Sequence, residues 1–249
     1  MPDLSVVIPV HDEEAILRPA CLELMAGLEA RGRDYELVLC ENGSRDGTRA
    51  ELARLAAERP RLRWVSLPEP NYGLALRQGI LAARGRLVVC DEIDLCDLSF
   101  HDRALPLLES GVAEMVVGSK RARGAEDRRP RTRRIATWAH NTLLRLLLGF
   151  RGTDTHGPKA LVRERLAPVA GRCVVDRDVF ASELVIRAQR EGVRVVEIPL
   201  TLCERRPPSV GLWRRVPAVL ARVARLVWVL RLGAPRAGPT PEGEKARRA

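Results

Sequence analysis

The chain has 249 residues, of which 46% are hydrophobic and 30% are charged. This balance can bury the core of one large domain or two small ones, so it excludes a wholly disordered or fibrous chain. The 42 Lys and Arg residues outnumber the 32 Asp and Glu residues, and the net charge of +10 favours anionic partners such as nucleotides, phospholipids or nucleic acid.

Cysteine usage and the N-terminus bear on the compartment. Six cysteines in a chain of this length do not indicate a disulfide framework, and there is no Cys-x-x-Cys pair to favour zinc or a redox dithiol. Residues 1–4 lack the basic and apolar character of a signal peptide, and no apolar run reaches the roughly 18 residues of a membrane span. We therefore expect a cytoplasmic protein, with peripheral binding at the cytoplasmic face of a membrane left open.

Short apolar runs alternate with longer amphipathic segments in the first half of the chain. The sequence predicts strands over 4–10, 35–40, 62–67 and 87–90, and helices over 13–30, 45–58 and 73–83. Uninterrupted Val, Leu and Ile strands separated by helices are typical of a mostly parallel sheet covered on both faces. Because such sheets bind ligands at the carboxyl ends of their strands, the polar clusters that follow these strands are candidate site residues.

The second half of the chain is less regular. The sequence predicts strands over 115–119, 158–162 and 193–198, helices over 135–148, 179–190 and 211–232, and an arginine-rich loop over 122–134. Pro, Gly and charged residues dominate the last segment, so we expect a disordered tail there. The expected organisation is a domain over 1–210, a helix over 211–232 and the tail over 233–249.

The segment Glu41-Asn42-Gly43-Ser44-Arg45-Asp46-Gly47-Thr48 follows the second predicted strand. Its glycines permit left-handed turns, and Ser44 or Asp46 can cap the next helix. Acidic and amide side chains at the end of a strand suit hydrogen bonds to a nucleobase or a ribose. The alternative is an ordinary glycine-rich turn with a capping aspartate.

The segment Asp91-Glu92-Ile93-Asp94 follows the fourth predicted strand and places three carboxylates within four residues. These carboxylates repel one another unless a cation or solvent lies between them. A divalent hard cation would pair with them and with the phosphates of a nucleotide. The alternative is a solvated acidic turn that leads into a helix capped by Asp97.

The basic segment from Lys120 to Arg134 suits phosphate, because guanidinium groups bind phosphate through two parallel hydrogen bonds. The alternative is a solvated run of charges. Nucleic acid is not an expected partner, because no aromatic residue interleaves the cluster.

The predicted helix over 211–232 is basic and amphipathic. Its arginines share one arc, its aliphatic residues occupy the opposite side, and Trp213 and Trp228 flank the apolar side. This pattern is typical of a helix that lies among lipid headgroups. The alternative is a terminal helix that packs its apolar face on its own domain.

These clusters, in this order, resemble the family 2 glycosyltransferases, in particular the polyprenyl-phosphate mannose or glucose synthases, over residues 4–209. Val7-Ile8-Pro9-Val10-His11-Asp12-Glu13-Glu14 resembles the opening strand and Pro-x-Tyr-Asn-Glu segment of the family, and residues 41–48 resemble its Asp-Asp-Gly-Ser-x-Asp-Gly-Thr motif. Later landmarks of the family are matched by Asn71, Gly73, Gly118-Ser119-Lys120-Arg121, Arg134, Asn141, Asp154-Thr155, Gly157, Glu183-Leu184, Glu197-Ile198-Pro199, Arg205 and Ser209.

The resemblance implies a GT-A-like nucleotide-sugar-binding α/β fold and an inverting transfer of a hexose. The implied donor is a nucleotide sugar of the GDP-mannose or UDP-glucose class, and the implied acceptor is a polyprenyl phosphate. The residues that it places at the nucleotide are Pro9, Glu13, Glu41, Asn42, Ser44, Asp46 and Asn71. It implies Mg²⁺ or Mn²⁺ on the acidic segment, with Asp91, Glu92 and Asp94 as candidate ligands. It implies catalytic assistance from Asp94, Arg121 and Arg134.

The chain also departs from the family pattern. The usual Asp-x-Asp-Leu stands here as Asp91-Glu92-Ile93-Asp94-Leu95, one residue longer, so the metal ligands among the three acids stay open. Asn42 replaces an acid, and His11 and Asp12 replace the Tyr-Asn pair, so the base and the sugar stay open as well. Two alternatives follow: a soluble glycosyltransferase with a small-molecule or glycan acceptor, and a catalytically inert nucleotide-sugar-binding protein.

Overall fold

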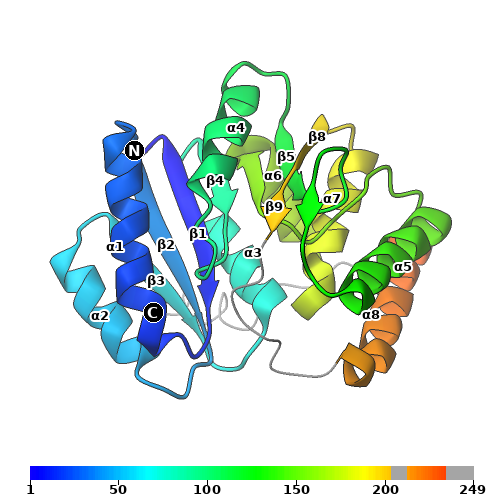
Figure 1. The fold of residues 1–249 in the computed structure, drawn as a ribbon, viewed down its shortest axis with the longest axis horizontal. Coiled ribbons are helices and arrows are strands. Elements are labelled where there is room, and N and C mark those ends of the chain that lie inside the picture. Colours follow the sequence, from blue (N-terminus) through cyan, green and yellow to red (C-terminus); the bar gives the residue numbers. More distant parts are fainter. Residues whose placement is uncertain (203–211, 234–249) are drawn as a thin grey trace, which may run out of the picture.

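The computed structural model of the chain describes residues 1–202 and 212–233. Its central sheet is built from β1 (Leu4–Val10), β2 (Tyr35–Asn42), β3 (Leu62–Leu67), β4 (Leu87–Cys90), β5 (Met115–Ser119), β7 (Lys159–Val162) and β8 (Val195–Pro199). The seven strands follow the order β3-β2-β1-β4-β7-β5-β8 (Figure 1). Neighbouring strands are parallel, except that β7 runs antiparallel to both β4 and β5.

Helices cover both faces of this sheet. One face carries α1 (Glu14–Ala30), α2 (Thr48–Glu58) and α4 (Leu98–Glu109). The other face carries α3 (Tyr72–Ala82), α6 (Arg163–Arg172) and α7 (Phe180–Arg190), with α5 (Arg131–Leu148) and α8 (Leu212–Leu232) at the outer end. The result is a three-layer α/β structure with a mostly parallel sheet, as the sequence predicts.

The two covered faces explain why the strands read as continuous apolar runs. In β1, Val6 and Ile8 join the hydrophobic core under α1, α2 and α4, whereas Val7 joins the core on the other face. All three side chains are fully buried. Because successive side chains of a strand point to opposite faces, a strand buried on both faces is mostly apolar, and the buried polar residue of β1, Ser5, donates a hydrogen bond to Glu36.

All seven predicted strands of the sheet are confirmed, but two parts of the second half differ from prediction. Helix α6 was not predicted, because its charged residues and Pro168 obscure an apolar period. The prediction of a loop over 122–134 is wrong at its end, since α5 begins at Arg131, directly after Pro130. The first turn of α5 is polar and largely exposed, so no apolar residue marks where the helix starts.

A second, two-stranded sheet holds the basic segment in place. Strand β6 (Glu126–Asp127) pairs in parallel with β9 (Thr201–Leu202), which follows β8. Asp127 and Arg129 form a paired hydrogen bond through both carboxylate oxygens, at 2.8 Å each. The segment is therefore more ordered than the solvated charge run that was the alternative.

Helix α8 packs against the domain. Val223, Leu226 and Val229 are buried in the same core as α5 and α7. For these positions the structure matches the packing alternative. The predicted tail from residue 234 onward, together with Arg205 and Ser209, lies outside the described residues. In the part of the chain that the structure describes, every helix is too short or too polar to cross a bilayer.

Candidate functional site

The loops that follow β1 and β2 are joined into one unit at the carboxyl end of the sheet. The backbone N–H of Asp12 donates to Ser44 Oγ (3.1 Å), and Arg45 N–H donates to Asp12 Oδ1 (2.7 Å). Glu13 N–H donates to Thr48 Oγ1 (2.9 Å). Asp12 has a φ of 53°, a left-handed conformation that the bonds to the neighbouring loop support.

The carboxylate of Glu41 lies inside this unit rather than on its surface. It is fully buried, and it accepts hydrogen bonds from Ser44 N–H (2.5 Å), Arg49 Nε (2.9 Å) and the Ser66 hydroxyl. Burial alone would raise the pKa of Glu41, but these donors outweigh it and hold that pKa below its ordinary value. Glu41 is thus charged and compensated by protein groups, and it fixes the shape of the loop.

Asn42 and Asn71 connect this unit to a distant part of the chain. Asn42 Oδ1 accepts from Asn71 N–H. Asn71 Oδ1 accepts from Leu74 N–H (3.1 Å) at the start of α3 and from Arg177 N–H (2.9 Å). Asn71 Nδ2 donates to Asp176 Oδ2 (2.9 Å). Asn42 thus holds Asn71, and Asn71 connects the loop after β2 to residues 176–177 in the second half of the chain.

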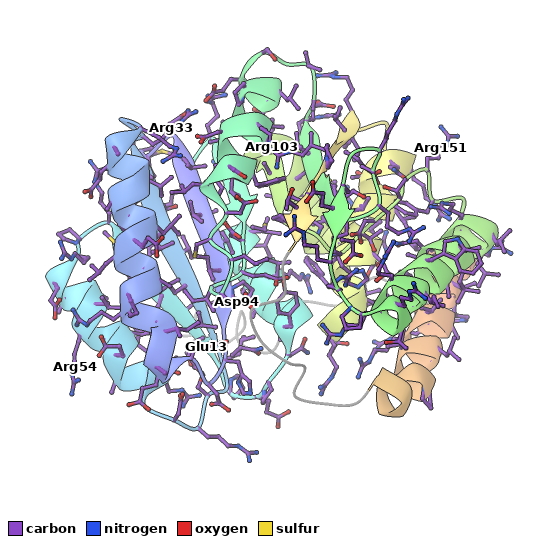
Figure 2. The ribbon with its side chains drawn as sticks, viewed as in Figure 1. Glu13, Arg33, Arg54, Asp94, Arg103 and Arg151 are labelled. Atoms are coloured by element: carbon purple, nitrogen blue, oxygen red, sulfur yellow. The ribbon has the colours of Figure 1, made fainter. Side chains whose placement is uncertain are left out.

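Pro9 and Asp46, the other two residues that the sequence assigned to the nucleotide, have contacts within the protein. Pro9 lies inside β1, opposite Cys40 of β2. Asp46 accepts hydrogen bonds from Glu14 N–H (3.1 Å) and Thr48 N–H (3.0 Å); the N-cap of α2 is Gly47, so Asp46, which was predicted to cap this helix, lies one residue before the capping position. Figure 2 shows Glu13, from the loop after β1, and Asp94, from the loop after β4, toward the same end of the sheet.

The three carboxylates of the acidic loop do not point into one space. Asp91 is 1% exposed, and its Oδ2 lies 3.0 Å from Nε2 of the equally buried His101 of α4. Its other oxygen accepts from Glu92 N–H (2.8 Å). Asp91 is therefore occupied inside the protein, which leaves Glu92 and Asp94 as the partly exposed acids of the loop.

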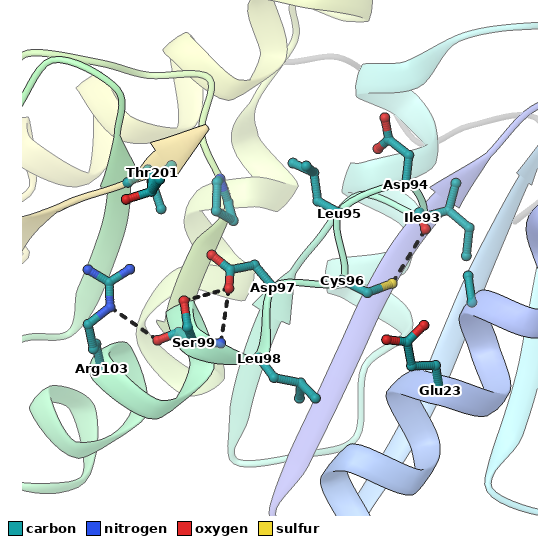
Figure 3. A pocket seen from close by; sticks show the side chains of 13 residues that line it. Glu23, Ile93, Asp94, Leu95, Cys96, Asp97, Leu98, Ser99, Arg103 and Thr201 are labelled. Atoms are coloured by element: carbon teal, nitrogen blue, oxygen red, sulfur yellow. Dashed lines mark hydrogen bonds between the residues drawn. The ribbon is translucent and has the colours of Figure 1, made fainter. Parts of the chain in front are cut away.

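Two neighbouring cavities flank the acidic loop, and Leu95, Pro158 and Leu200 line both. We call the first the acidic-loop cavity, a space of about 540 Å³ lined by Asp94 and Asp97 among others. Figure 3 shows Asp97 turned toward Ser99, with Asp94 directed away from it. Asp97 Oδ1 accepts from Ser99 N–H (3.0 Å) at the start of α4, which is the predicted capping role.

We call the second the basic cavity, a space of about 340 Å³. Its polar lining consists of Tyr72, Glu92, Lys120, Arg129, Arg133, His156 and Lys159. Four of these side chains are Lys or Arg and one is an acid, so the cavity suits an anion. Burial raises the pKa of Glu92, as expected for a carboxylate held away from water.

Lys159 differs from the other cations of the basic cavity. Lys120 Nζ lies 3.1 Å from Asp154 Oδ2, and Arg129 is paired with Asp127. Lys159 is only 3% exposed, and its Nζ donates to the backbone oxygen of Gly157 (2.8 Å). Within residues 1–202 and 212–233, no carboxylate forms an ion pair with it.

Burial lowers the pKa of Lys159 to about 8, close to neutral. Proteins normally pair a buried charge with an opposite one, because an isolated buried charge is costly. An anionic ligand in the basic cavity would supply the partner that Lys159 lacks.

A buried polar network forms the floor of the basic cavity. Asp154 accepts a hydrogen bond from His156 N–H (3.0 Å) and forms an ion pair with Lys120. Burial alone would raise the pKa of Asp154, but Lys120 and the backbone donors lower it to about 2. Burial and the nearby ring of His140, 5.0 Å away between centroids, lower the pKa of His156 to about 3. Asp154 is therefore ionised and His156 neutral throughout the physiological range.

The sequence analysis and the structure select different arginines. Arg121 and Arg134 are both exposed, and neither is part of the described lining of the basic cavity. Arg129 and Arg133, from the same segment, do line it. No sequence signal separated the arginines of this segment, since which of them turns inward depends on the β6–β9 pair and on the start of α5.

Lys159 and His156 were also missed, although one signal for Lys159 was present. The chain contains only three lysines, at 120, 159 and 245, and two of these line the basic cavity. In a chain that uses arginine almost everywhere else, a lysine inside an apolar strand is unusual.

The fit of a divalent cation follows from the donor set. The described residues include no group of three or more His, Cys, Asp or Glu side chains arranged to hold a metal ion. Mg²⁺ bound to a nucleotide commonly needs only one or two carboxylates, because phosphates and water supply its remaining ligands. Glu92 and Asp94 are each of the right chemical type for such a site, and because they line different cavities, either one could hold the ion together with phosphates and water.

The three-layer α/β fold, with an acidic loop and a basic cavity at the carboxyl ends of its strands, is of the GT-A class. The profile of the family described as Glycosyl transferase family 2 matches residues 5–167. The chain belongs to this family.

Among curated proteins, the chain is 29% identical over 233 residues to "Glycosyltransferase AglD" of Haloferax volcanii, covering 92% of this chain and 37% of that protein. It is 29% identical over 208 residues to "Dolichyl-phosphate hexose transferase" of the same organism, covering 82% of this chain and 84% of that protein. The chain thus spans well under two thirds of the length of AglD.

Among solved structures, glucosyl-3-phosphoglycerate synthase from Mycobacterium tuberculosis superposes with a TM-score of 0.65 at 22% identity. The match covers 95% of this chain and 82% of that one, and that crystal contained Mn²⁺, UDP-glucose and phosphoglyceric acid. At this identity the likeness establishes the GT-A fold.

Proposed function

We propose that this enzyme is an inverting transferase that moves a hexose from a nucleotide sugar of the GDP-mannose or UDP-glucose class to a polyprenyl phosphate. The observation that carries the proposal is Lys159, a buried cation that opens into the basic cavity beside the acidic loop without a carboxylate partner among the described residues. The printed name of the Haloferax dolichyl-phosphate relative supports the acceptor class.

The donor would lie across the carboxyl end of the sheet. We expect the nucleoside to bind the unit formed by residues 11–13 and 41–48. Pro9 and Asn71 would stabilise the conformation of this unit. Either Glu92 or Asp94, which line different cavities, is the proposed holder of Mg²⁺ or Mn²⁺, and Asp91 fixes the loop through its contact with His101. When bound, such an ion supplies positive charge against the diphosphate.

Transfer requires an oxygen of the acceptor phosphate to form a bond to the anomeric carbon while the bond to the nucleoside diphosphate breaks. The diphosphate leaves with the electron pair. Lys120, Lys159, Arg129 and Arg133 would neutralise the departing diphosphate and orient the acceptor phosphate, and these interactions strengthen as charge develops.

A strong general base is unnecessary in this reaction, because a phosphate monoester is already an anion at neutral pH. The neutral imidazole of His156 lies in the same cavity, with its Nδ1 3.1 Å from the Thr155 hydroxyl. Arg121 and Arg134 stay in the proposal as exposed arginines on the same segment, placed to guide an anionic substrate toward the cavity.

A second acceptor class has support of its own. The basic cavity recognises phosphate and not the chain that carries it, and the neighbouring crystal structure contained the small phosphorylated acid phosphoglyceric acid. A soluble phosphorylated acceptor is therefore the competing function.

The test begins with donor binding and proceeds to transfer. Thermal shifts are measured with GDP-mannose, UDP-glucose and related donors, with and without Mn²⁺; a donor at a hundredfold excess over its Kd raises the free energy of unfolding by about 2.7 kcal/mol. The stabilising donor, radiolabelled in its sugar, is then offered to a polyprenyl phosphate in detergent and to phosphoglyceric acid.

Label that partitions into the organic phase supports the lipid acceptor, and label on phosphoglyceric acid supports the competing one. If no donor stabilises the protein in the presence of Mn²⁺, both proposals are refuted.

A further inference from the structure

Helices α5 and α8 lie side by side at the end of the molecule opposite α1 and α2 (Figure 1). Arg231 Nε of α8 donates to the backbone oxygen of Leu147 of α5 (2.8 Å). Each helix buries one stripe in the core: Asn141, Leu144 and Leu148 of α5, and Val223, Leu226 and Val229 of α8. The apolar side of α8, which the sequence analysis considered for membrane binding, is therefore largely buried in the core of the protein.

The outward sides of the same two helices are nevertheless apolar. Of the nine large hydrophobic side chains that are exposed in the described residues, five lie on this helix pair: Ile135, Trp138, Leu146, Leu220 and Trp228. Leu146 is 75% exposed and Ile135 is 62% exposed. On α5 the spacing of Ile135, Trp138 and Leu146 places them on one side of the helix. Clustered exposed apolar side chains of this kind mark an interaction surface.

The charges of the pair select the chemistry of its partner. The chain has 32 acidic residues, yet neither α5 nor α8 contains an Asp or a Glu. Among the described side chains of the two helices, the exposed charged residues are arginines: Arg131, Arg134, Arg225 and Arg231. Two such surfaces repel each other, so charge disfavours a second copy of the chain and favours an anionic partner. Tryptophan, aliphatic residues and arginine together are the composition of a surface that binds lipid headgroups.

We propose that the outward side of α5 and α8, here the α5–α8 face, docks on a bilayer that contains anionic lipids. The face consists of Ile135, Trp138, Leu146, Leu220, Trp228, Arg131, Arg134, Arg225 and Arg231. Its use rests on the proposed function in one respect: α5 also carries Arg133, which lines the basic cavity. Docking through α5 would bring that cavity to the depth at which the phosphate of a polyprenyl phosphate lies.

Vesicle flotation of the full chain tests the apolar part of the face. The double variant Trp138→Glu/Trp228→Glu should weaken binding to phosphatidylglycerol-containing vesicles at least about tenfold, because it places charge where apolar surface leaves water. Leu81→Glu/Val112→Glu is the matched control, since Leu81 on α3 and Val112 in the loop after α4 are exposed away from this face and the charge change is the same. Equal loss in both variants, or in neither, would refute the face; melting curves exclude unfolding.

The charged part of the face has its own variant. Arg131→Gln/Arg225→Gln should lower binding to phosphatidylglycerol vesicles about fivefold for each arginine, and the loss should vanish in high salt. Binding to pure phosphatidylcholine should change little. Sedimentation velocity tests whether a second copy of the chain binds this face instead. If the wild type forms concentration-dependent dimers and the double Trp variant does not, the lipid assignment is wrong and the face binds a second copy.

Activity measurements separate this face from the proposed function. With a short, water-soluble prenyl phosphate, the double Trp variant should match the wild type; with polyprenyl phosphate embedded in vesicles, it should be at least about tenfold slower. Wild-type protein that binds vesicles but transfers no sugar to any acceptor would refute the proposed function and leave the face intact. Transfer to vesicle-embedded acceptor that survives the double Trp change would refute the face and leave the function.

Discussion

The two polar regions at the carboxyl end of the sheet differ in how their charges are compensated. In the unit after β1 and β2, the buried carboxylate of Glu41 receives donors from Ser44, Arg49 and Ser66. In the basic cavity, the buried ammonium of Lys159 donates to the backbone oxygen of Gly157, and no carboxylate of the described residues forms an ion pair with it. The first region is complete without a ligand, whereas the second places charge where an anion is needed.

This difference suggests that the first region positions the backbone and that the second binds the reacting anions. A fully bonded carboxylate fixes the backbone that a nucleoside contacts, and it gains little when the ligand arrives. An undercompensated cation destabilises the empty protein and gains an ion pair on binding, so its contribution appears as affinity and rate. Four substitutions test this comparison, given from the largest expected effect to the smallest.

Asp94→Asn should lower turnover at least about 10²-fold, because it removes one of the two accessible charges of the acidic loop from the reacting diphosphate. The measurement is the rate of sugar transfer at saturating donor and Mn²⁺. Asp97→Asn is the control on the same loop; it should leave both stability and turnover close to wild type, because asparagine caps a helix about as well as aspartate. An unchanged rate in Asp94→Asn would remove this carboxylate from the mechanism.

Lys159→Met should slow transfer about 10- to 100-fold and at the same time raise the melting temperature of the ligand-free protein. The pKa of Lys159 is lowered from 10.5 to about 8 in the folded state, which corresponds to roughly 3 kcal/mol of cost when the group is charged.

Below pH 8 this cost is fully present in the wild type, and it disappears as the pH rises from about 8 to 10.5 because the native state releases its proton first. The stability gain of the methionine variant should therefore shrink over the same interval in denaturant titrations. A variant that is less stable than wild type at pH 7, or equally active, would show that Lys159 is a structural residue.

Arg133→Gln should reduce kcat/KM about tenfold, because Arg133 lines the basic cavity. Arg134→Gln, its neighbour in sequence with an exposed side chain, should change kcat/KM by no more than about threefold, the scale of a screened surface charge. Both variants remove the same charge from the same helix turn. A larger loss from Arg134→Gln would favour the residue that the sequence pattern selected.

Glu41→Gln should have the smallest effect on rate, a few-fold increase in the KM for the donor, and should mainly lower stability by about 1–3 kcal/mol. The pKa of Glu41 is held below its ordinary value, so the carboxylate stabilises the wild type at neutral pH and loses that contribution as the pH falls below the ordinary range of a glutamate. The difference between variant and wild type should close on acidification. A rate loss as large as that of Asp94→Asn would mean that Glu41 touches the reacting groups.

Much of the fold could be predicted because its signals are local. The runs that became β1 to β5 are largely apolar, as expected of strands covered on both faces, although Glu36 interrupts β2 and Arg63 interrupts β3. The start of α5 could not be predicted, since its first turn is polar and solvent-exposed. The antiparallel insertion of β7 also leaves no trace in the sequence, because side-chain alternation is the same in both strand directions.

The site was predicted in kind but not in detail. Acid and base at the carboxyl end of the sheet follow from the composition of the loops. Asp91, Glu92 and Asp94 are nearly equivalent in the sequence. In the structure, Asp91 pairs with His101, whereas Glu92 and Asp94 line different cavities.

The sequence by itself determined the strand pattern, the loops that carry polar residues and the excess of positive charge, because periodicity and composition are properties of neighbours along the chain. Only the tertiary structure decided which cations face a shared cavity and which apolar side chains of α5 and α8 stay in contact with water. Burial and pairing of a charge depend on groups far away in sequence, and the energy of a buried charge is set by those groups.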